Sequence, residues 1–176
     1  MQTADEIEQP RATQKDYKIL RWLTTVDHKE IGIMYLYMAT LFFVVAGLFA
    51  LLMRTQLAVA NNNFLSPDVY NQIFTMHGVT MIFFVMVPAL LGFQVYFVPM
   101  MIGANDMAFP RMNAFSFWIT LFGGFLLFFS FAAGGAPNAG WFNYAPLNEY
   151  NYSDSPGIDY YCMGLFGWCW YHEYRN

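Results

Sequence analysis

One histidine lies inside a long stretch of sequence that carries no Asp, Glu, Lys or Arg. The stretch covers residues 69–105, and the histidine is His77. An ionisable side chain inside an apolar membrane segment is costly, so it points to a function. A neutral imidazole is an axial ligand of haem iron in many proteins, and it also serves as a hydrogen-bonded group at a helix interface. The spacing alone leaves both interpretations open.

Four other side chains at the ends of uncharged stretches are able to contribute to a site. Arg54 ends the first stretch, where it fits an arginine at the lipid headgroups or a second contact to a ligand held by His77. Trp141 comes late in the third stretch, where an aromatic at the membrane interface is the ordinary interpretation. Asp106 and Asn113 lie in and beside the loop between the second and third stretches, where loop and helix-capping roles are usual.

Three uncharged stretches supply the elements that position these residues. Because about 20 apolar residues carry a helix across the bilayer core, each stretch is long enough for one crossing. We predict three spans, over residues 31–53, 73–102 and 114–133. Pro88 and Pro99 fall inside the second span, and neighbouring helices make them tolerable there. The predicted fold is an all-α, polytopic transmembrane helical bundle with three full spans.

The composition is that of a membrane protein. Hydrophobic residues make up 57% of the chain and charged residues 11%, whereas about a quarter of a soluble domain is usually charged. The formal net charge of −4 provides no basic surface for phosphates. We therefore expect the lipid bilayer, and no nucleic acid, as a partner.

The distribution of positive charge predicts the orientation in the membrane. Five of the eight Lys and Arg residues lie in residues 1–30, a predicted amphipathic head, and the first two loops carry one each. Cytoplasmic segments are enriched in Lys and Arg. The head and Asp106 are therefore predicted on the cytoplasmic side, and Arg54 and Trp141 on the outer side.

Four motifs, in order and at compatible spacing, resemble subunit I of the haem–copper terminal oxidases, and the bacterial aa-type cytochrome c oxidases in particular. They are Thr25-Val26-Asp27-His28-Lys29-Glu30-Ile31-Gly32, Met76-His77-Gly78, Ile102-Gly103-Ala104-Asn105-Asp106-Met107-Ala108-Phe109-Pro110-Arg111-Met112-Asn113, and Gly140-Trp141-Phe142-Asn143-Tyr144-Ala145-Pro146-Leu147. The resemblance covers about residues 22–159. It implies that residues 31–160 are the N-terminal part of such a subunit, which normally has many more helices.

The resemblance assigns a role to each candidate residue. His77 falls on an axial ligand of the low-spin haem, and Arg54 on the arginine that hydrogen-bonds the formyl group of that haem. Trp141 falls on the tryptophan near the haem propionates. Asp106 falls on the mouth of the D proton channel, and Asn113 on an asparagine of that channel.

Three further positions carry expectations from the resemblance. Asp27 and His28 are expected to cap and anchor the first span, without a metal role. Val95 departs from the family pattern, which usually has an asparagine eleven residues before the channel aspartate. Because valine cannot hydrogen-bond a water, either Gln94 or Asn105 compensates, or proton uptake is altered.

The resemblance also implies the parent activity. That enzyme reduces oxygen to water with electrons from cytochrome c and pumps protons across the bacterial plasma (inner) membrane. Its partners are subunits II and III, and cytochrome c donates through subunit II. Only one histidine of this chain lies in a span, so the high-spin haem and copper are expected only in the complete subunit, and this chain alone is expected to be inactive. The alternatives are a quinol oxidase of the same superfamily and a non-catalytic membrane fragment.

The last segment, residues 161–176, differs from the expected continuation of the family. A fourth span is expected to begin near Pro156-Gly157-Ile158, but the sequence then becomes rich in Trp, Tyr and Cys. A one-base shift in the codons of Trp168-Cys169-Trp170-Tyr171-His172 gives a run of small residues, which suits a packed membrane helix. We therefore expect a one-base frameshift near Tyr160. The alternative is a genuine aromatic tail at the membrane interface.

Overall fold

The computed structural model describes residues 21–149, 151–153 and 155–173, with side chains described as far as residue 166. The predicted head lies mostly outside the described residues. Within them the chain is helical and contains no strand. The elements are α2 (His28–Gln56), α3 (Pro67–Val79), η2 (Thr80–Met86), α4 (Val87–Met101), α5 (Pro110–Phe129) and α6 (Gly157–Glu173).

Three helices of the described chain are long and apolar enough to cross a membrane, which confirms the predicted number of spans. They cover His28–Gln56, Pro67–Met101 and Pro110–Phe129. Each helix begins a few residues before the predicted span because polar caps and prolines, rather than apolar residues, start it. Asp27 caps α2 by accepting a hydrogen bond from the backbone N–H of Lys29, and Ser66 caps α3 just before Pro67. Hydropathy therefore predicted where the spans lie, but it did not predict the first helical turn of each span.

The middle of the second span is a π-helix, η2, which the sequence analysis did not predict. Pro88 has no backbone N–H, so the carbonyl of Phe84 loses its α-helical donor there. At the same place the N–H of Val87 bonds to the carbonyl of Ile82, five residues back. One set of fully buried residues recurs at every fourth position: Met76, Thr80, Phe84 and Pro88. In an α-helix, residues four apart in sequence differ by about 40° in their direction around the helix axis. The wider turn of η2 offsets this rotation, so these residues stay on one buried face.

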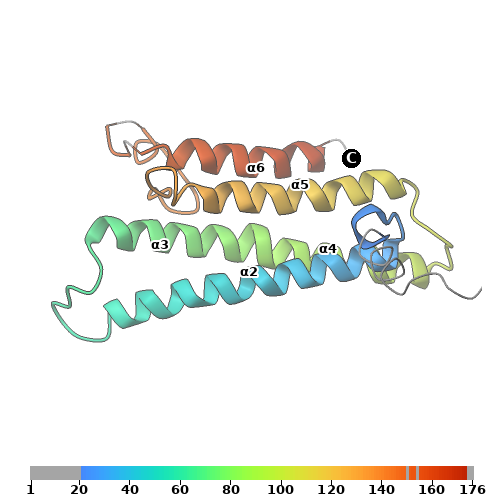
Figure 1. Ribbon diagram of the computed structural model, residues 1–176, viewed down its shortest axis with the longest axis horizontal. Coiled ribbons are helices and arrows are strands. Elements are labelled where there is room, and N and C mark those ends of the chain that lie inside the picture. Colours follow the sequence, from blue (N-terminus) through green and yellow to red (C-terminus); the bar gives the residue numbers. More distant parts are fainter. Residues whose placement is uncertain (1–20, 150, 154, 174–176) are drawn as a thin grey trace, which may run out of the picture.

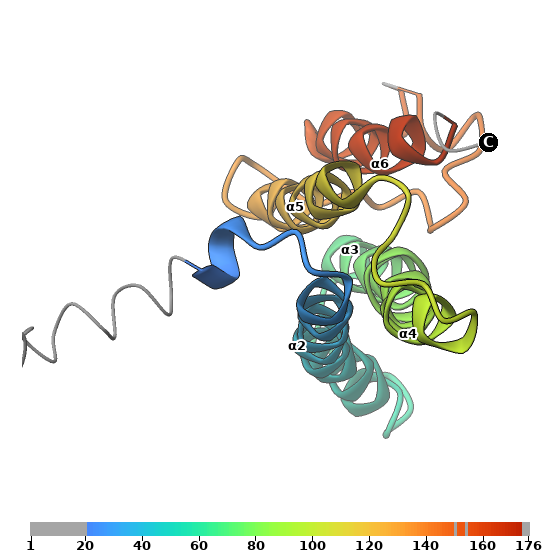
Figure 2. The same ribbon diagram turned by 90° about the vertical axis from the view of Figure 1, so that its right-hand side faces the viewer.

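The helices lie side by side, with α2 against the α3–η2–α4 span and α5 between that span and α6 (Figures 1 and 2). Small residues allow the closest approach. A Cβ atom on Gly92 of α4 would lie 3.0 Å from the carbonyl oxygen of Gly32 on α2. Farther along, the rings of Phe42 and Phe84 contact each other in a tilted arrangement, 5.3 Å between centroids, over Gly124 of α5. The core therefore runs along the bundle at the meeting line of α2, η2 and α5.

The loops are grouped at the two ends of the bundle because successive spans run in opposite directions. The α2–α3 and α5–α6 connections lie at one end, and residues 21–27 lie at the other with the α4–α5 connection (Figure 1). Arg54 and Trp141 therefore share one end, and His28 and Asp106 share the opposite end. Which end faces the cytoplasm stays a prediction.

Helix α6 begins at Gly157, where the sequence analysis placed the start of a fourth span. It packs closely on α5, since a Cβ atom on Gly123 would lie only 2.6 Å from the carbonyl oxygen of Gly164. The helix runs without a break past Tyr161, whose side chain is 7% exposed. The structure does not bear on the reading frame of the gene, so the frameshift stays a prediction.

Candidate functional site

His77 sits in the last turn of α3 and faces α2. Its Nδ1 atom lies 2.8 Å from the carbonyl oxygen of Ala46, and the side chain is partly buried. A carbonyl only accepts hydrogen bonds, so Nδ1 carries the proton. In the neutral ring Nε2 then holds the free electron pair, which is the form of imidazole that binds a metal. The backbone of α2 thus fixes both the tautomer and the orientation of His77.

Trp141 is brought to the helical turn that carries His77. Gly78 follows His77 directly, and a Cβ atom placed on it would lie 3.2 Å from Cβ of Trp141. A larger residue at position 78 would displace the tryptophan. The Trp141 side chain is 44% exposed. The structure therefore places two of the predicted site residues on adjoining segments at the same end of the bundle.

Arg54 lies at the same end but not beside His77. It is exposed in the last turn of α2, eight residues beyond Ala46. Eight residues of α-helix advance about 12 Å. Arg54 and the His77 ring are therefore separated by about two turns along α2, so only an extended ligand would contact both.

Asp106 lies at the opposite end, in the loop after α4. Its Oδ1 atom accepts a hydrogen bond from the N–H of Met107 at 2.8 Å and lies 3.4 Å from Nδ1 of His28. The His28 side chain is buried and that of Asp106 is about half exposed (45%). Nε2 of His28 is buried with no hydrogen-bond partner in the described chain. Asp106 thus faces solvent on one side and an interior imidazole on the other.

Asn113 begins a polar row that runs inward along α5. Its side chain is 3% exposed, and neither amide atom has a hydrogen-bond partner among the described residues. The Ser116 hydroxyl donates to the backbone carbonyl of Asn113 at 2.7 Å, so Tyr35 must donate its hydroxyl proton to Ser116, also at 2.7 Å. Thr120 donates to the carbonyl of Ser116 at 2.8 Å. From Asn113 to Thr120 the row advances about 10 Å into the bundle.

Val95 is buried at 2% exposure near this end of the bundle. It lines a cavity of about 320 Å³ with Gln94, Val98, Pro99 and Met107. Met107 directly follows Asp106, so the cavity adjoins the loop of that carboxylate. Of the two side chains predicted to compensate for Val95, the structure places Gln94 in the same cavity. Asn105 does not line it.

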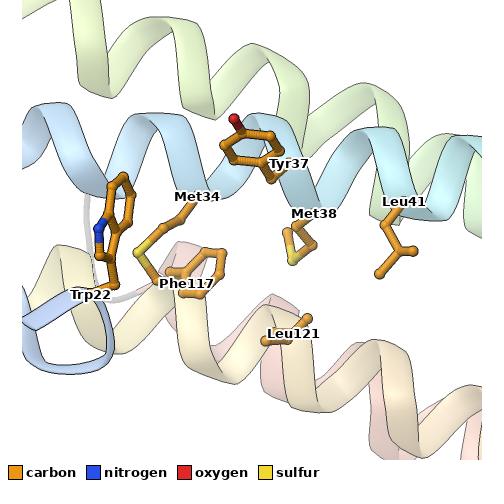
Figure 3. Close-up of a pocket in the computed structure, with 7 residues that line it drawn as sticks. All are labelled: Trp22, Met34, Tyr37, Met38, Leu41, Phe117 and Leu121. Carbon is orange, nitrogen blue, oxygen red and sulfur yellow. The ribbon is translucent and has the colours of Figure 1, made fainter. Parts of the chain in front are cut away.

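An apolar groove lies elsewhere on the molecule, between α2 and α5 (Figure 3). Its volume is about 470 Å³, and its lining is Trp22, Met34, Tyr37, Met38, Leu41, Phe117 and Leu121. None of these side chains is charged. The residues that line the groove do not include His77 or Asp106.

The sequence analysis missed several polar residues of these sites. Tyr35, Ser116 and Thr120 were not singled out, although Ser116 and Thr120 stand four residues apart in an otherwise apolar helix, a spacing that places both on one face. His28 was expected only to anchor the first span with Asp27. The capping by Asp27 is confirmed, and the contact of His28 with Asp106 is new.

The residues around His77 fit a haem better than an ion held by protein ligands alone. The described residues contain no group of three or more His, Cys, Asp or Glu side chains able to hold a metal ion. His77 instead offers one free nitrogen, oriented by Ala46. The neighbouring Gly78 has no side chain. One imidazole inside a membrane-spanning helix suits a haem ligand, because the macrocycle supplies the other donors.

Comparison with known proteins decides the family. Residues 30–171 match the family described as Cytochrome C and Quinol oxidase polypeptide I. The chain belongs to this oxidase polypeptide I family. The match includes His77, Asp106, Asn113 and Trp141, and it extends over α2 to α6.

The chain is similar to relatives that carry two different names, cytochrome c oxidase subunit 1 and quinol oxidase subunit 1. It is 53% identical over 156 residues to cytochrome c oxidase subunit 1 of Alkalihalophilus pseudofirmus, covering 88% of this chain and 25% of that protein. It is 49% identical over 144 residues to quinol oxidase subunit 1 of Bacillus subtilis, covering 82% of this chain and 22% of that protein. A probable quinol oxidase subunit 1 of Staphylococcus aureus is 50% identical over 150 residues, covering 85% of this chain and 22% of that protein. The chain thus spans about a quarter of the length of these relatives.

Proposed function

We propose that this chain is the N-terminal part of subunit I of a haem–copper terminal oxidase that reduces oxygen to water, takes electrons from cytochrome c and pumps protons. The observation that carries the proposal is the hydrogen bond from His77 Nδ1 to the carbonyl of Ala46, which leaves Nε2 free inside a membrane-spanning helix. The family membership supports the activity, and the similarity to the Alkalihalophilus cytochrome c oxidase subunit 1 supports the donor.

In this proposal three residues of the chain hold a low-spin haem. His77 would bind the haem iron through Nε2, because Nδ1 is hydrogen-bonded to Ala46. Arg54 provides a long cationic side chain about two turns away along α2, in reach of a polar substituent such as a formyl group. Trp141 provides an indole N–H for the propionate region, on a segment that adjoins Gly78. When bound, the haem supplies one-electron transfer through its iron. The residues of this chain bind and orient it and exclude water from its apolar side.

The opposite end of the bundle takes up protons in this proposal. Asp106 is exposed and receives a proton from the cytoplasm, and His28 holds the carboxylate at the edge of the interior. Asn113, with two unpaired buried amide atoms, requires polar partners, which water supplies in protein interiors. The hydroxyl groups of Ser116 and Tyr35 continue the polar path along α5. The polar row from Asn113 to Thr120 thus extends about 10 Å into the membrane, and water would link it to Asp106.

The assembled enzyme needs components outside this chain. We propose subunits II and III as partners, with cytochrome c donating electrons through subunit II, in a bacterial plasma membrane with the N-terminus in the cytoplasm. The high-spin haem and copper belong to the complete subunit.

A quinol oxidase is the second candidate. The specific observation in its favour is that the relatives named quinol oxidase are 49–50% identical to this chain, close to the 53% of the cytochrome c oxidase. The two functions differ in the donor, so the test is oxygen consumption by the assembled oxidase with reduced cytochrome c or with a quinol. We expect turnover with cytochrome c. Turnover with quinol alone would overturn the proposed donor, and absence of oxygen consumption with both would overturn the enzymatic function.

A further inference from the structure

Two buried hydroxyl groups hold the backbone of Trp141 from both sides. Oγ1 of Thr75 accepts a hydrogen bond from the N–H of Gly140 at 2.9 Å, immediately before the tryptophan. The hydroxyl of Tyr161 donates to the carbonyl oxygen of Trp141 itself. Thr75 is fully buried and Tyr161 is 7% exposed. The two hydroxyl groups come from α3 and α6, so two different helices fix this one loop residue.

Thr75 is part of a polar row on α3 that binds the whole segment before Trp141. Asp68, Gln72 and Thr75 are spaced by four and three residues, which places them on one face of the helix. Their loop partners are, in order, the side-chain amide of Asn138 at 3.3 Å, the N–H of Ala136 at 3.2 Å, and the N–H of Gly140 at 2.9 Å. Gln72 also donates to Asp68 at 2.9 Å, so the row is internally linked.

Position 78 completes the same face, three residues after Thr75. A Cβ atom placed on Gly78 would lie 3.2 Å from Cβ of Trp141, so glycine at this position makes room for the tryptophan. Gly140 has a φ of +81°, a value that favours glycine, so the chain turns there toward α3. The polar row, the turn and the open position at Gly78 together set where the indole lies relative to His77.

We propose that Thr75 and Tyr161 are positioning residues that hold Trp141 beside the helical turn that carries the proposed haem ligand His77. The significance of this positioning role rests on the proposed function, in which Trp141 contacts the haem. Each hydroxyl group acts through the backbone of the loop and does not itself touch the ligand. Loss of either one frees one side of the tryptophan while leaving His77 and its bond to Ala46 in place.

The first test is amide exchange at Gly140 in the purified full chain. Thr75→Val keeps the shape of the side chain and removes the acceptor, and Thr75→Ser keeps the acceptor as the matched control. One hydrogen bond of ordinary net strength corresponds to a loss of protection of about three- to tenfold. We expect this loss in Thr75→Val and near-native protection in Thr75→Ser. Equal protection in both variants would overturn the proposal.

The second test follows the indole and the haem. The N–H resonance of Trp141 should shift in Thr75→Val and in Tyr161→Phe, and return in Thr75→Ser. In the haem-loaded protein, the absorption maximum should shift in the same two variants. An indole signal that is unchanged in both Thr75→Val and Tyr161→Phe would overturn the positioning role. Tyr161→Phe also keeps the proposal testable if Thr75→Val fails to fold.

A further variant separates this inference from the proposed function. A haem band that is unchanged by Thr75→Val but abolished by His77→Ala would overturn the positioning role and leave the proposed function standing. A haem band that survives His77→Ala would overturn the proposed haem ligand, whereas the amide and indole results do not depend on haem.

Discussion

The crossing of α2 and α4 at Gly32 and Gly92 allows a quantitative test of the helix packing that brings His28 to Asp106. A Cβ atom on Gly32 would lie 2.9 Å from Cβ of Tyr96 and 3.0 Å from the carbonyl oxygen of Gly92, whereas an ordinary contact is 3.4 Å or longer. Gly32→Ala must therefore part the helices by about 0.5 Å, a gap that weakens every contact along the line. Overpacking of this kind costs about 1–3 kcal/mol.

Gly47 of α2 provides the matched control. A Cβ atom there meets nothing within 4 Å. Both Gly→Ala changes gain about 1 kcal/mol of helix propensity, so the difference between Gly32→Ala and Gly47→Ala isolates the cost of the clash. We expect Gly32→Ala to be less stable than Gly47→Ala by about 1–3 kcal/mol in the free energy of unfolding. Gly47→Ala is expected to match or exceed the original chain.

The assay is denaturant-induced unfolding of the purified chain in detergent micelles, followed by circular dichroism. Gly32 lies four residues from His28, which contacts Asp106, so the weakened crossing should also loosen that contact. Equal stability of Gly32→Ala and Gly47→Ala would show that α2 and α4 do not meet at this point. The geometry that brings His28 to Asp106 would then be refuted.

Three further predictions concern the polar path, proton uptake and the gene. Tyr35→Phe and Ser116→Ala should be coupled by about 1 kcal/mol in a double-mutant cycle of unfolding free energies, because each removes the same buried hydrogen bond; purely additive effects would argue against that bond. Asp106→Asn, which cannot carry a proton from the cytoplasm, should slow proton uptake by the assembled oxidase after a pulse of oxygen, as followed by a pH indicator, and an unchanged rate would exclude Asp106 from the path. The DNA downstream of the Tyr160 codon should, in a shifted frame, encode further apolar helices, and a shifted frame that lacks them would disprove the frameshift.

Much of the fold followed from the sequence because lipid imposes a simple rule on it. Long uncharged stretches must be helices, since backbone groups find no partner in hydrocarbon, and this rule gave the three spans. The same rule does not describe how a helix turns inside the membrane. The π-helix η2 arises from Pro88 together with the burial of Phe84 against Phe42 and Gly124, and such tertiary contacts leave no periodic signal.

The site residues were predictable to different degrees for physical reasons. His77 stood out because a single ionisable residue in an apolar span is costly, and the haem role of Trp141 was predicted through the resemblance. The partners that fix them were not predictable. Ala46 acts through its backbone carbonyl, which any residue provides, and Thr75 looks like an ordinary helix residue until the loop 65 residues farther along is placed against it.

The central claim is that His77 is an axial ligand of haem, and haem retention by two histidine variants tests it most directly. His77→Ala removes the proposed ligand, and His28→Ala removes a histidine at the opposite end of the bundle as the control. Haem content is measured by absorbance after purification from membranes under identical conditions. We expect that His77→Ala loses the haem band and that His28→Ala keeps it. Equal haem bands in the two variants would contradict it.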